Sequence, residues 1–215
     1  MRADLHTHSI FSDGESIPAE IVRFAKEKDH NAIAITDHVD MTNVRTVVEQ
    51  VIKAVELSDS DIKVIPGVEI THVPPSKMDK VIEEARRYGA EWIVVHGETV
   101  TEPVAYGTDL QAAKNPEVDV LAHPGFISEE AMQAAKDNDV LIEITGRAGH
   151  NITNGYVAAM ARKFDAKMIV DSDAHSPYDY MDEKRAYFVA MGAGLTKAEA
   201  DLAIQKTPFE AVRKL

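Results

Sequence analysis

The sequence contains no cysteine. This absence excludes a disulfide framework and a zinc site built from thiolates, so any bound metal must be held by imidazole and carboxylate groups. No run approaches the roughly 18 apolar residues that a membrane span needs, and no basic segment followed by an apolar one opens the sequence. We therefore expect a soluble, cytoplasmic protein with no membrane partner.

Positive charge is also scarce. Lys and Arg number 23 against 36 Asp and Glu, which gives a formal net charge of −13 at pH 7. Because a phosphate backbone attracts clustered Lys and Arg, this balance opposes unassisted binding to nucleic acid. A local cationic site made by metal ions could still hold a small phosphorylated substrate.

Low-complexity linkers are missing too. The 11 Gly and 9 Pro are spread along the 215 residues. This length is within the range of one domain and is long enough to bury a sizeable core. We expect residues 1–215 to form a single domain, and the sequence leaves its oligomeric state open.

The chain is organised around its first thirteen residues. Asp4–His8 reads as a short strand, in which side chains alternate between two faces. His6 and His8 then project from the same face, about 7 Å apart along the backbone, and can both bind one cation. Such a pair alone is a weak signal, because two exposed polar residues would produce the same pattern.

Five further strand-like runs each end in a potential metal ligand, and this recurrence is the stronger signal. The runs cover residues 32–36, 64–68, 92–95, 118–122 and 168–170. The residues that follow them are Asp37 and His38, Glu69, His96, His123, and Asp171, Asp173 and His175, respectively.

Short, largely apolar strands alternate with helical segments along the whole chain. With a further strand at 140–144, seven strands predict a parallel sheet of the α/β class, covered by helices. Two matches to a capping box, beginning at Thr196 and Thr207, predict two short helices at the end. An open sheet and a closed barrel both fit, but only a barrel gathers six strand ends around one mouth.

Nine side chains are the candidate ligands, six imidazoles and three carboxylates. They are His6, His8, Asp13, His38, Glu69, His96, His123, Asp173 and His175. Their number exceeds what one tetrahedral ion needs and suits two or three ions. The alternative, that they are separate capping or core residues, does not explain why they recur after strands.

The motifs around these residues resemble the PHP (polymerase and histidinol phosphatase) family. They are His-Thr-His at 6–8, Ser-Asp-Gly at 12–14, Thr-Asp-His at 36–38, Gly-Val-Glu at 67–69, His96, Ala-His-Pro at 122–124 and Ser-Asp-Ala-His at 172–175. The resemblance covers essentially the whole chain. It implies a distorted (β/α)7 TIM-like barrel, the PHP fold, and a trinuclear centre of zinc, manganese or iron.

The resemblance also distributes the ligands among the ions. It places His6, His8, Glu69 and Asp173 on one ion, and Glu69, His96 and His123 on a second, so that Glu69 is the bridge. Asp13, His38 and His175 would hold the third ion. Asp13 stands where several family members have His, and two or three ions are therefore expected.

The same residues lead to a mechanism. Three divalent ions, three carboxylates and a bridging hydroxide leave a positive balance of roughly +2, which matches a phosphate dianion. The hydroxide is expected to attack in line while the third ion stabilises the leaving alkoxide, so no phosphoenzyme is required. In this mechanism Glu69, Asp13 and His175 are the catalytic residues.

Two residues near the same rim are candidates for substrate binding. Arg147 follows the sixth strand and could form a bidentate hydrogen bond with phosphate. An arginine on a loop more often faces solvent without such a function. His150 is the second candidate.

Four other polar residues are expected to support the structure rather than to bind metal or substrate. They include His30 and His72, and His30 is expected at a helix end opposite the mouth of the barrel. Asp37 and Asp171 are expected to orient the imidazole rings of the ligands through hydrogen bonds, a function that metal sites usually need.

The sequence thus favours a metal-dependent phosphatase of a small phosphomonoester, most like the histidinol-phosphate type. The family also contains nucleotide phosphatases and exonucleases, and fold and metal site do not separate these activities. A non-catalytic PHP scaffold is a further alternative, disfavoured because a scaffold needs no complete ligand set. The leaving group and the native metal stay open.

Overall fold

Parallel strands form a ring in the computed structural model, which describes residues 2–56, 58 and 61–215. In order around the ring they are β1 (Arg2–Asp4), β2 (His30–Ile35), β4 (Lys63–Ile70), β5 (Trp92–His96), β6 (Val120–Ala122), β7 (Leu141–Thr145) and β8 (Met168–Asp171). The short β3 (His38–Val39) also pairs with β4, placing His38 opposite Glu69.

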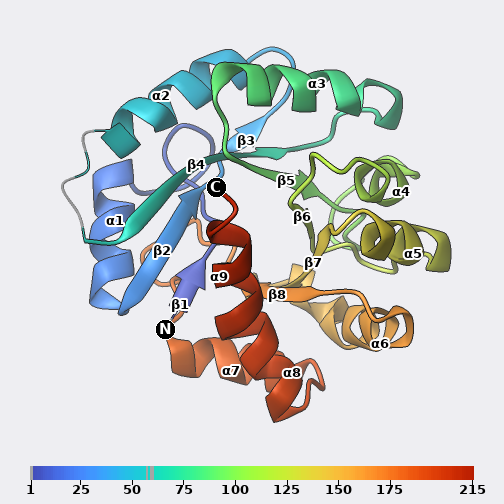
Figure 1. Cartoon of the computed structure of the whole chain (residues 1–215). Helices are drawn as coiled ribbons and strands as arrows, with labels where there is room; N and C mark the ends of the chain where they lie inside the picture. The colour runs from blue at the N-terminus through green and yellow to red at the C-terminus, as the bar shows by residue number, and fades with distance from the viewer. Residues whose placement is uncertain (1, 57, 59–60) are drawn as a thin grey trace.

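Contacts between β1 and β8 close the ring. Thr7 forms an isolated parallel bridge with Ala174. Leu5 N donates a hydrogen bond to Asp171 Oδ1 at 2.8 Å, so a side chain takes the place of a ladder bond at this seam. The result is a nearly closed barrel of seven parallel strands, which confirms the distorted (β/α)7 TIM-like fold (Figure 1).

Helices cover the outside of the barrel (Figure 1). They are α1 (Pro18–Glu27), α2 (Val44–Glu56), α3 (Pro75–Tyr88), α4 (Thr108–Ala113), α5 (Glu129–Asp137), the 3₁₀ turn η1 (His150–Thr153), α6 (Asn154–Phe164) and α7 (Glu183–Gly192). On α2, the valines at 44, 47, 48 and 51 are buried, a helical spacing that turns one apolar face to the barrel. In the described part of the chain, no helix combines the length and apolarity needed to cross a membrane.

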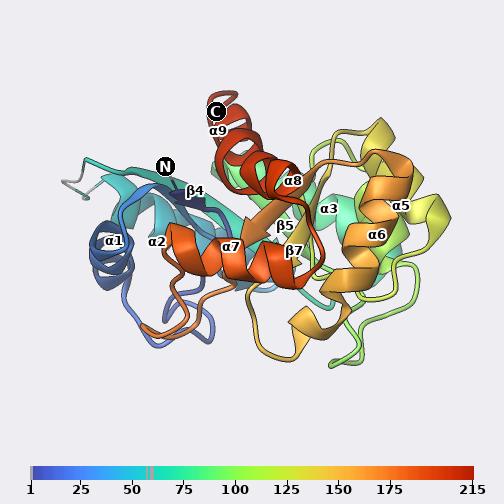
Figure 2. The ribbon, with the colours of Figure 1, turned by 90° about the horizontal axis from the view of Figure 1, so that it is seen from below.

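The C-terminal segment closes the amino end of the barrel. It consists of α8 (Lys197–Asp201), the π-helical turn η2 (Leu202–Lys206) and α9 (Thr207–Val212). Phe209 and Val212 pack against the apolar interior of the barrel, and Lys63 Nζ donates to Val212 O at 3.0 Å. The loops that carry the candidate ligands lie at the opposite end, as Figure 2 shows.

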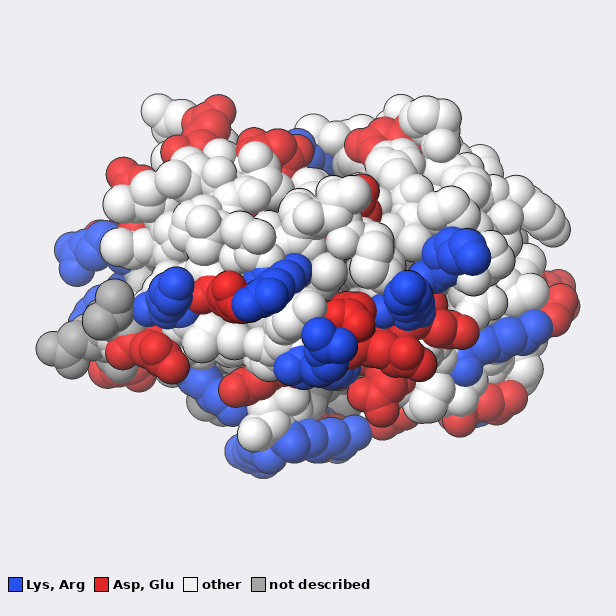
Figure 3. All heavy atoms as spheres, turned by 90° about the horizontal axis from the view of Figure 1, so that it is seen from above, with Lys and Arg blue, Asp and Glu red and all other residues white. Residues whose placement is uncertain are grey.

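Charges of both signs share the face formed by α2 and α3 (Figure 3). Arg45 Nε lies 2.8 Å from Glu49 Oε1 on α2, and Arg87 Nη1 lies 3.1 Å from Glu84 Oε1 on α3. Because basic groups here pair with acidic neighbours, this face offers no stripe of positive charge to a polynucleotide.

Two details of the expected secondary structure are wrong, the end of the first strand and the second capping box. The first strand ends at Asp4 rather than His8. The backbone after Asp4 forms its hydrogen bonds with side chains and with the loop after β8, and so does not continue a regular ladder. Both short helices expected at the end are present as α8 and α9, and the capping box at Thr196 is formed. Thr207 is the first residue of α9 but forms no capping box, because the chain reaches it from the π turn η2 in a helical conformation. The wider π turn before Pro208 accommodates its ring and missing N–H.

Candidate metal centre

Glu69 occupies the middle of the site and is fully buried. Its Oε2 lies 3.4 Å from His6 Nε2 and 3.5 Å from His8 Nε2, and its Oε1 lies 3.5 Å from His123 Nε2. N–H···O hydrogen bonds span about 2.7 to 3.2 Å, so these three distances are too long for them, whereas His38 Nδ1 lies 2.8 Å from Glu69 Oε2. The three longer distances match the spacing of about 3.3 to 3.6 Å between ligand atoms around one tetrahedral ion.

Asp173, on the loop after β8, lies close to the same three imidazoles. Its Oδ1 lies 3.2 Å from His8 Nε2 and 3.7 Å from His6 Nε2, and its Oδ2 lies 3.6 Å from His123 Nε2. Both Asp173 and His123 hold positive φ angles, of 52° and 29°. Such backbone strain in non-glycine residues is concentrated at functional sites, where the surrounding structure holds it in place.

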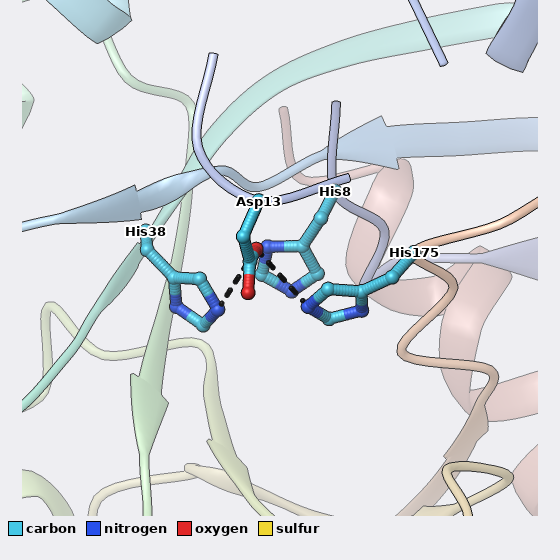
Figure 4. A group of neighbouring side chains, drawn as sticks. All are labelled: His8, Asp13, His38 and His175. Atoms are coloured by element: carbon cyan, nitrogen blue, oxygen red, sulfur yellow. Dashed lines mark ion pairs between the residues drawn. The ribbon is translucent and has the colours of Figure 1, made fainter. Parts of the chain in front are cut away.

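A second group lies nearer to solvent (Figure 4). Asp13 Oδ1 is 3.4 Å from His38 Nε2 and 3.2 Å from His175 Nε2. The ring of His8 stacks against those of His38 and His175, with centroids 4.3 and 4.1 Å away. The ligand atoms of all four residues lie within 4.8 Å of one another. The group expected from the sequence is therefore brought together, with His8 added to it.

The third group joins Glu69 to His96 and His123, whose ligand atoms also lie within 4.8 Å of one another. All nine candidate ligands thus meet at the carboxyl ends of the strands. Their function as metal ligands stays a prediction.

Unpartnered buried atoms show that this donor set fits a cation. They are His6 Nε2, His8 Nδ1 and Nε2, both carboxylate oxygens of Glu69, His123 Nδ1 and Asp173 Oδ1. A buried polar group without a partner costs about 1 to 3 kcal/mol. Imidazole and carboxylate donors suit zinc, manganese and iron, and divalent ions would satisfy the Nε2 atoms and the carboxylate oxygens among them.

The charges of the site shift the pKa values of neighbouring groups in both directions. The Glu69 and Asp13 carboxylates raise the pKa of His38 to about 9, although burial opposes this. Burial and the neighbouring His38 lower the pKa of His8 to about 3. The pKa of Glu69 lies well below its ordinary value, because His6 and His38 outweigh the effect of burial. The site therefore retains anionic carboxylates and draws positive charge towards them.

Glu143 contacts two of the candidate ligands and was not identified from the sequence. His6 Nδ1 lies 2.7 Å from Glu143 Oε1, and His123 N donates to Glu143 Oε2 at 3.0 Å. Glu143 is fully buried in β7. A single carboxylate inside the apolar run 140–144 was the available signal.

Asp37 and Asp171 do not take the orienting function that we expected. Asp37 accepts hydrogen bonds from Ser9 Oγ at 2.7 Å and Ser12 Oγ at 2.6 Å, and so fixes the loop that carries Asp13. Asp171 accepts from the Leu5 backbone and supports the seam between β1 and β8.

A pocket of about 560 Å³ opens above the site, and both substrate-binding candidates line it. Arg147 Nη1 lies 3.8 Å from Asp179 Oδ2. His150 lies with its ring centroid 4.4 Å from that of His123. Both candidates therefore face the space where a substrate would enter.

Two residues of this pocket were not expected there. His72, read as structural, lines it and lies 3.2 Å from Glu102 Oε2. Glu102 was not among the candidate site residues. The sequence indicates it only as an acidic residue on the Pro-containing loop that follows His96. His30, in contrast, is buried at the start of β2 and contacts Met181 O at 2.8 Å.

Comparisons of the sequence identify relatives along its full length. The PHP domain model matches residues 4–95. An uncharacterized protein of Methanocaldococcus jannaschii is 48% identical, with 100% of both chains covered. Ribonuclease P protein component 3 of Methanosarcina barkeri is 26% identical, covering 98% of this chain and 88% of that protein. A probable phosphatase of Thermoanaerobacter sp. strain X514 is also 26% identical, covering 90% and 87%.

Solved structures share the fold. A chain in the cryo-EM structure of archaeal ribonuclease P with mature tRNA has a TM-score of 0.71 at 18% identity, covering 98% of this chain and 90% of that one. A candidate histidinol phosphatase of Listeria monocytogenes has a TM-score of 0.62 at 14% identity, covering 86% and 100%. The matching family model, the full-length relatives and the barrel agree, and the chain belongs to the PHP domain family.

Proposed function

We propose that the protein is a metal-dependent phosphoesterase that hydrolyses a small phosphomonoester of the histidinol-phosphate type. One observation carries the proposal: the buried Nε2 atoms of His6, His8 and His123 lie 3.2 to 3.7 Å from carboxylate oxygens of Glu69 and Asp173, at or beyond the upper limit for N–H···O hydrogen bonds. Two or three ions of zinc, manganese or iron are the proposed cofactors.

When bound, such ions activate a water as nucleophile and neutralise charge on phosphate oxygens. Glu69 suits a bridging position, because its two oxygens face different imidazoles, Oε2 towards His6 and Oε1 towards His123. Asp13 and His175, nearer to solvent, lie where the leaving group of a substrate would be held.

The pocket sets the class of substrate. Its volume of about 560 Å³ is within the usual range of roughly 300 to 1,000 Å³ for small-molecule sites. Arg147 can offer two parallel N–H donors to a phosphate that lies against the ligand cluster. The formal charge of −13 and the mixed charges in Figure 3 support a small substrate over a polynucleotide.

A second function is supported by the relatives: a protein subunit of a ribonucleoprotein, without catalysis of its own. Ribonuclease P protein component 3 is among the full-length relatives. The intact ligand set weighs against this reading, because an RNA scaffold has no need of buried, unpartnered carboxylates. A probable phosphatase among the relatives supports the catalytic reading.

One experiment separates the two. The purified protein is assayed for metal by elemental analysis, then tested on phosphorylated metabolites and on a short single-stranded oligonucleotide, with manganese, zinc and iron each supplied. We expect near-stoichiometric metal and hydrolysis of a small monoester. Metal-free folded protein that copurifies with RNA and hydrolyses none of these substrates would support the subunit function instead.

A further inference from the structure

Glu102 brings a carboxylate into the mouth of the barrel from the loop between β5 and α4. Its Oε2 lies 3.2 Å from His72 Nε2 and 3.3 Å from His96 Nε2. Its Oε1 lies 3.4 Å from His150 Nε2. One carboxylate therefore faces three imidazoles, and one of these, His96, is a candidate ligand of the metal centre.

His96 can bind an ion through only one nitrogen in this arrangement. Its Nδ1 lies 3.1 Å from Gly97 O, and a carbonyl accepts a proton there, so the proton is placed on Nδ1 and the lone pair on Nε2. The same Nε2 faces Glu102. An ion held by His96 is thus within the reach of the Glu102 carboxylate.

The spacing supports a shared ion. Ligand atoms around a tetrahedral zinc ion lie about 3.3 to 3.6 Å apart, and His96 Nε2 lies 3.3 Å from Glu102 Oε2. Glu102, His96 and His72 form a group whose ligand atoms lie within 4.8 Å of one another, beside the group of Glu69, His96 and His123. We propose that Glu102 is an additional ligand of the ion held by His96. This inference rests on the proposed metal centre.

The loop is built to present Glu102 in this position. Glu98 Oε1 accepts hydrogen bonds from Gly107 N at 2.8 Å and Asp109 N at 3.1 Å. Asp109 Oδ1 in turn accepts from Glu98 N at 2.8 Å, which ties the two ends of the loop together. Beside Glu102, the Thr99 hydroxyl lies 2.8 Å from His150 Nδ1. The base of the loop is thus fixed while Glu102 reaches inwards.

A further protein ligand would change what the ion can do. Structural zinc sites have closed coordination, whereas catalytic sites keep a position open for water or substrate. A carboxylate at this position would compete with a phosphate for the ion. Glu102 therefore sets how strongly this ion is held and how readily it accepts an anion.

The alternative is a partly exposed pair between Glu102 and His72 alone, with side chains 39% and 43% exposed. Such a pair contributes little to stability and leaves metal affinity unchanged. Substitution of Glu102 by the isosteric Gln separates the two, because an amide is a weaker ligand than a carboxylate but keeps the shape. Glu15→Gln is the matched control, since Glu15 is an exposed acid on the loop after β1 whose side chain makes no hydrogen bond within the described residues.

The test titrates metal-free wild type, Glu102→Gln and Glu15→Gln with Zn²⁺ alone, in competition with a chromophoric chelator. We expect one zinc equivalent to bind about ten- to hundredfold more weakly in Glu102→Gln, with the other equivalents unchanged and Glu15→Gln equal to wild type. Thermal unfolding in EDTA, expected to be identical for all three, verifies the fold. Equal zinc affinities in wild type and Glu102→Gln would overturn this inference alone, whereas wild type that binds no zinc would overturn the metal centre and the inference with it.

Discussion

Glu143 Oε1 lies 2.7 Å from His6 Nδ1, with both side chains fully buried. A carboxylate at Nδ1 places the proton there and directs the lone pair of Nε2 towards Glu69 and Asp173. The other oxygen of Glu143 accepts from His123 N at 3.0 Å. One buried residue therefore orients one ligand and holds the backbone of a second.

Glu143→Gln is expected to weaken metal binding about ten- to hundredfold, because an amide has one acceptor oxygen and cannot serve both His6 and His123 N. Chelator competition with zinc measures the effect. Glu91→Gln, an exposed acid at the start of β5, is the control. Unchanged zinc affinity in Glu143→Gln would refute the orienting function.

Glu69→Gln should abolish hydrolysis. A neutral amide is a poor bridge between two cations and leaves their mutual repulsion uncompensated. Steady-state turnover and metal content are measured on the same preparation. Near-normal turnover with all ions retained would exclude the bridging position.

Asp13→Ala should remove one ion selectively. Asp13 is half-exposed and contacts His38 and His175 from a surface loop, so its loss leaves the buried cluster around Glu69 intact. Elemental analysis after dialysis is expected to show one ion fewer per chain, together with a lower rate. If both quantities equal those of wild type, the assignment of the third ion is wrong.

Arg147→Ala should raise KM for a small phosphomonoester about ten- to hundredfold, since one charge-assisted contact is worth roughly 1.5 to 3 kcal/mol. Metal content should stay constant, because Arg147 contacts Asp179 rather than a ligand. The dependence of KM on salt should be shallow for one phosphate and steep for a polynucleotide. Preferential cleavage of an oligonucleotide from its end would favour the nuclease instead.

Asp109 should make stability depend on pH. Burial raises the pKa of its carboxyl to about 8, and the hydrogen bond from Glu98 N offsets this only in part. Between its ordinary pKa of 3.8 and about 8, the folded protein holds a proton that the unfolded chain has lost. Stability is therefore lost as pH rises through this window.

Asp109→Asn removes this titration. The unfolding free energy of the variant relative to wild type, from urea denaturation in EDTA, should increase from about pH 4 to pH 8 and then level off. A difference that is the same at every pH would show that Asp109 does not titrate in this range.

The sequence by itself determined the barrel and which residues meet at its mouth. Strand alternation and parallel pairing are local rules, so a ligand placed after each apolar run must appear at the same end of the sheet. His6, Glu69 and Asp173 could be assigned to one site on this basis. The capping box at Thr196 is local in the same sense.

Only the tertiary structure decided how those ligands are supported. Glu143 meets His6 across 137 positions of the chain, and Glu102 meets His72 across 30, distances at which no sequence periodicity connects them. Asp37 and Asp171 were given the wrong partners for the same reason. Thr207 begins α9 as expected but forms no capping box, because the chain reaches it from η2 in a helical conformation. Local patterns specify elements, whereas closure of the ring decides which side chains come within contact distance.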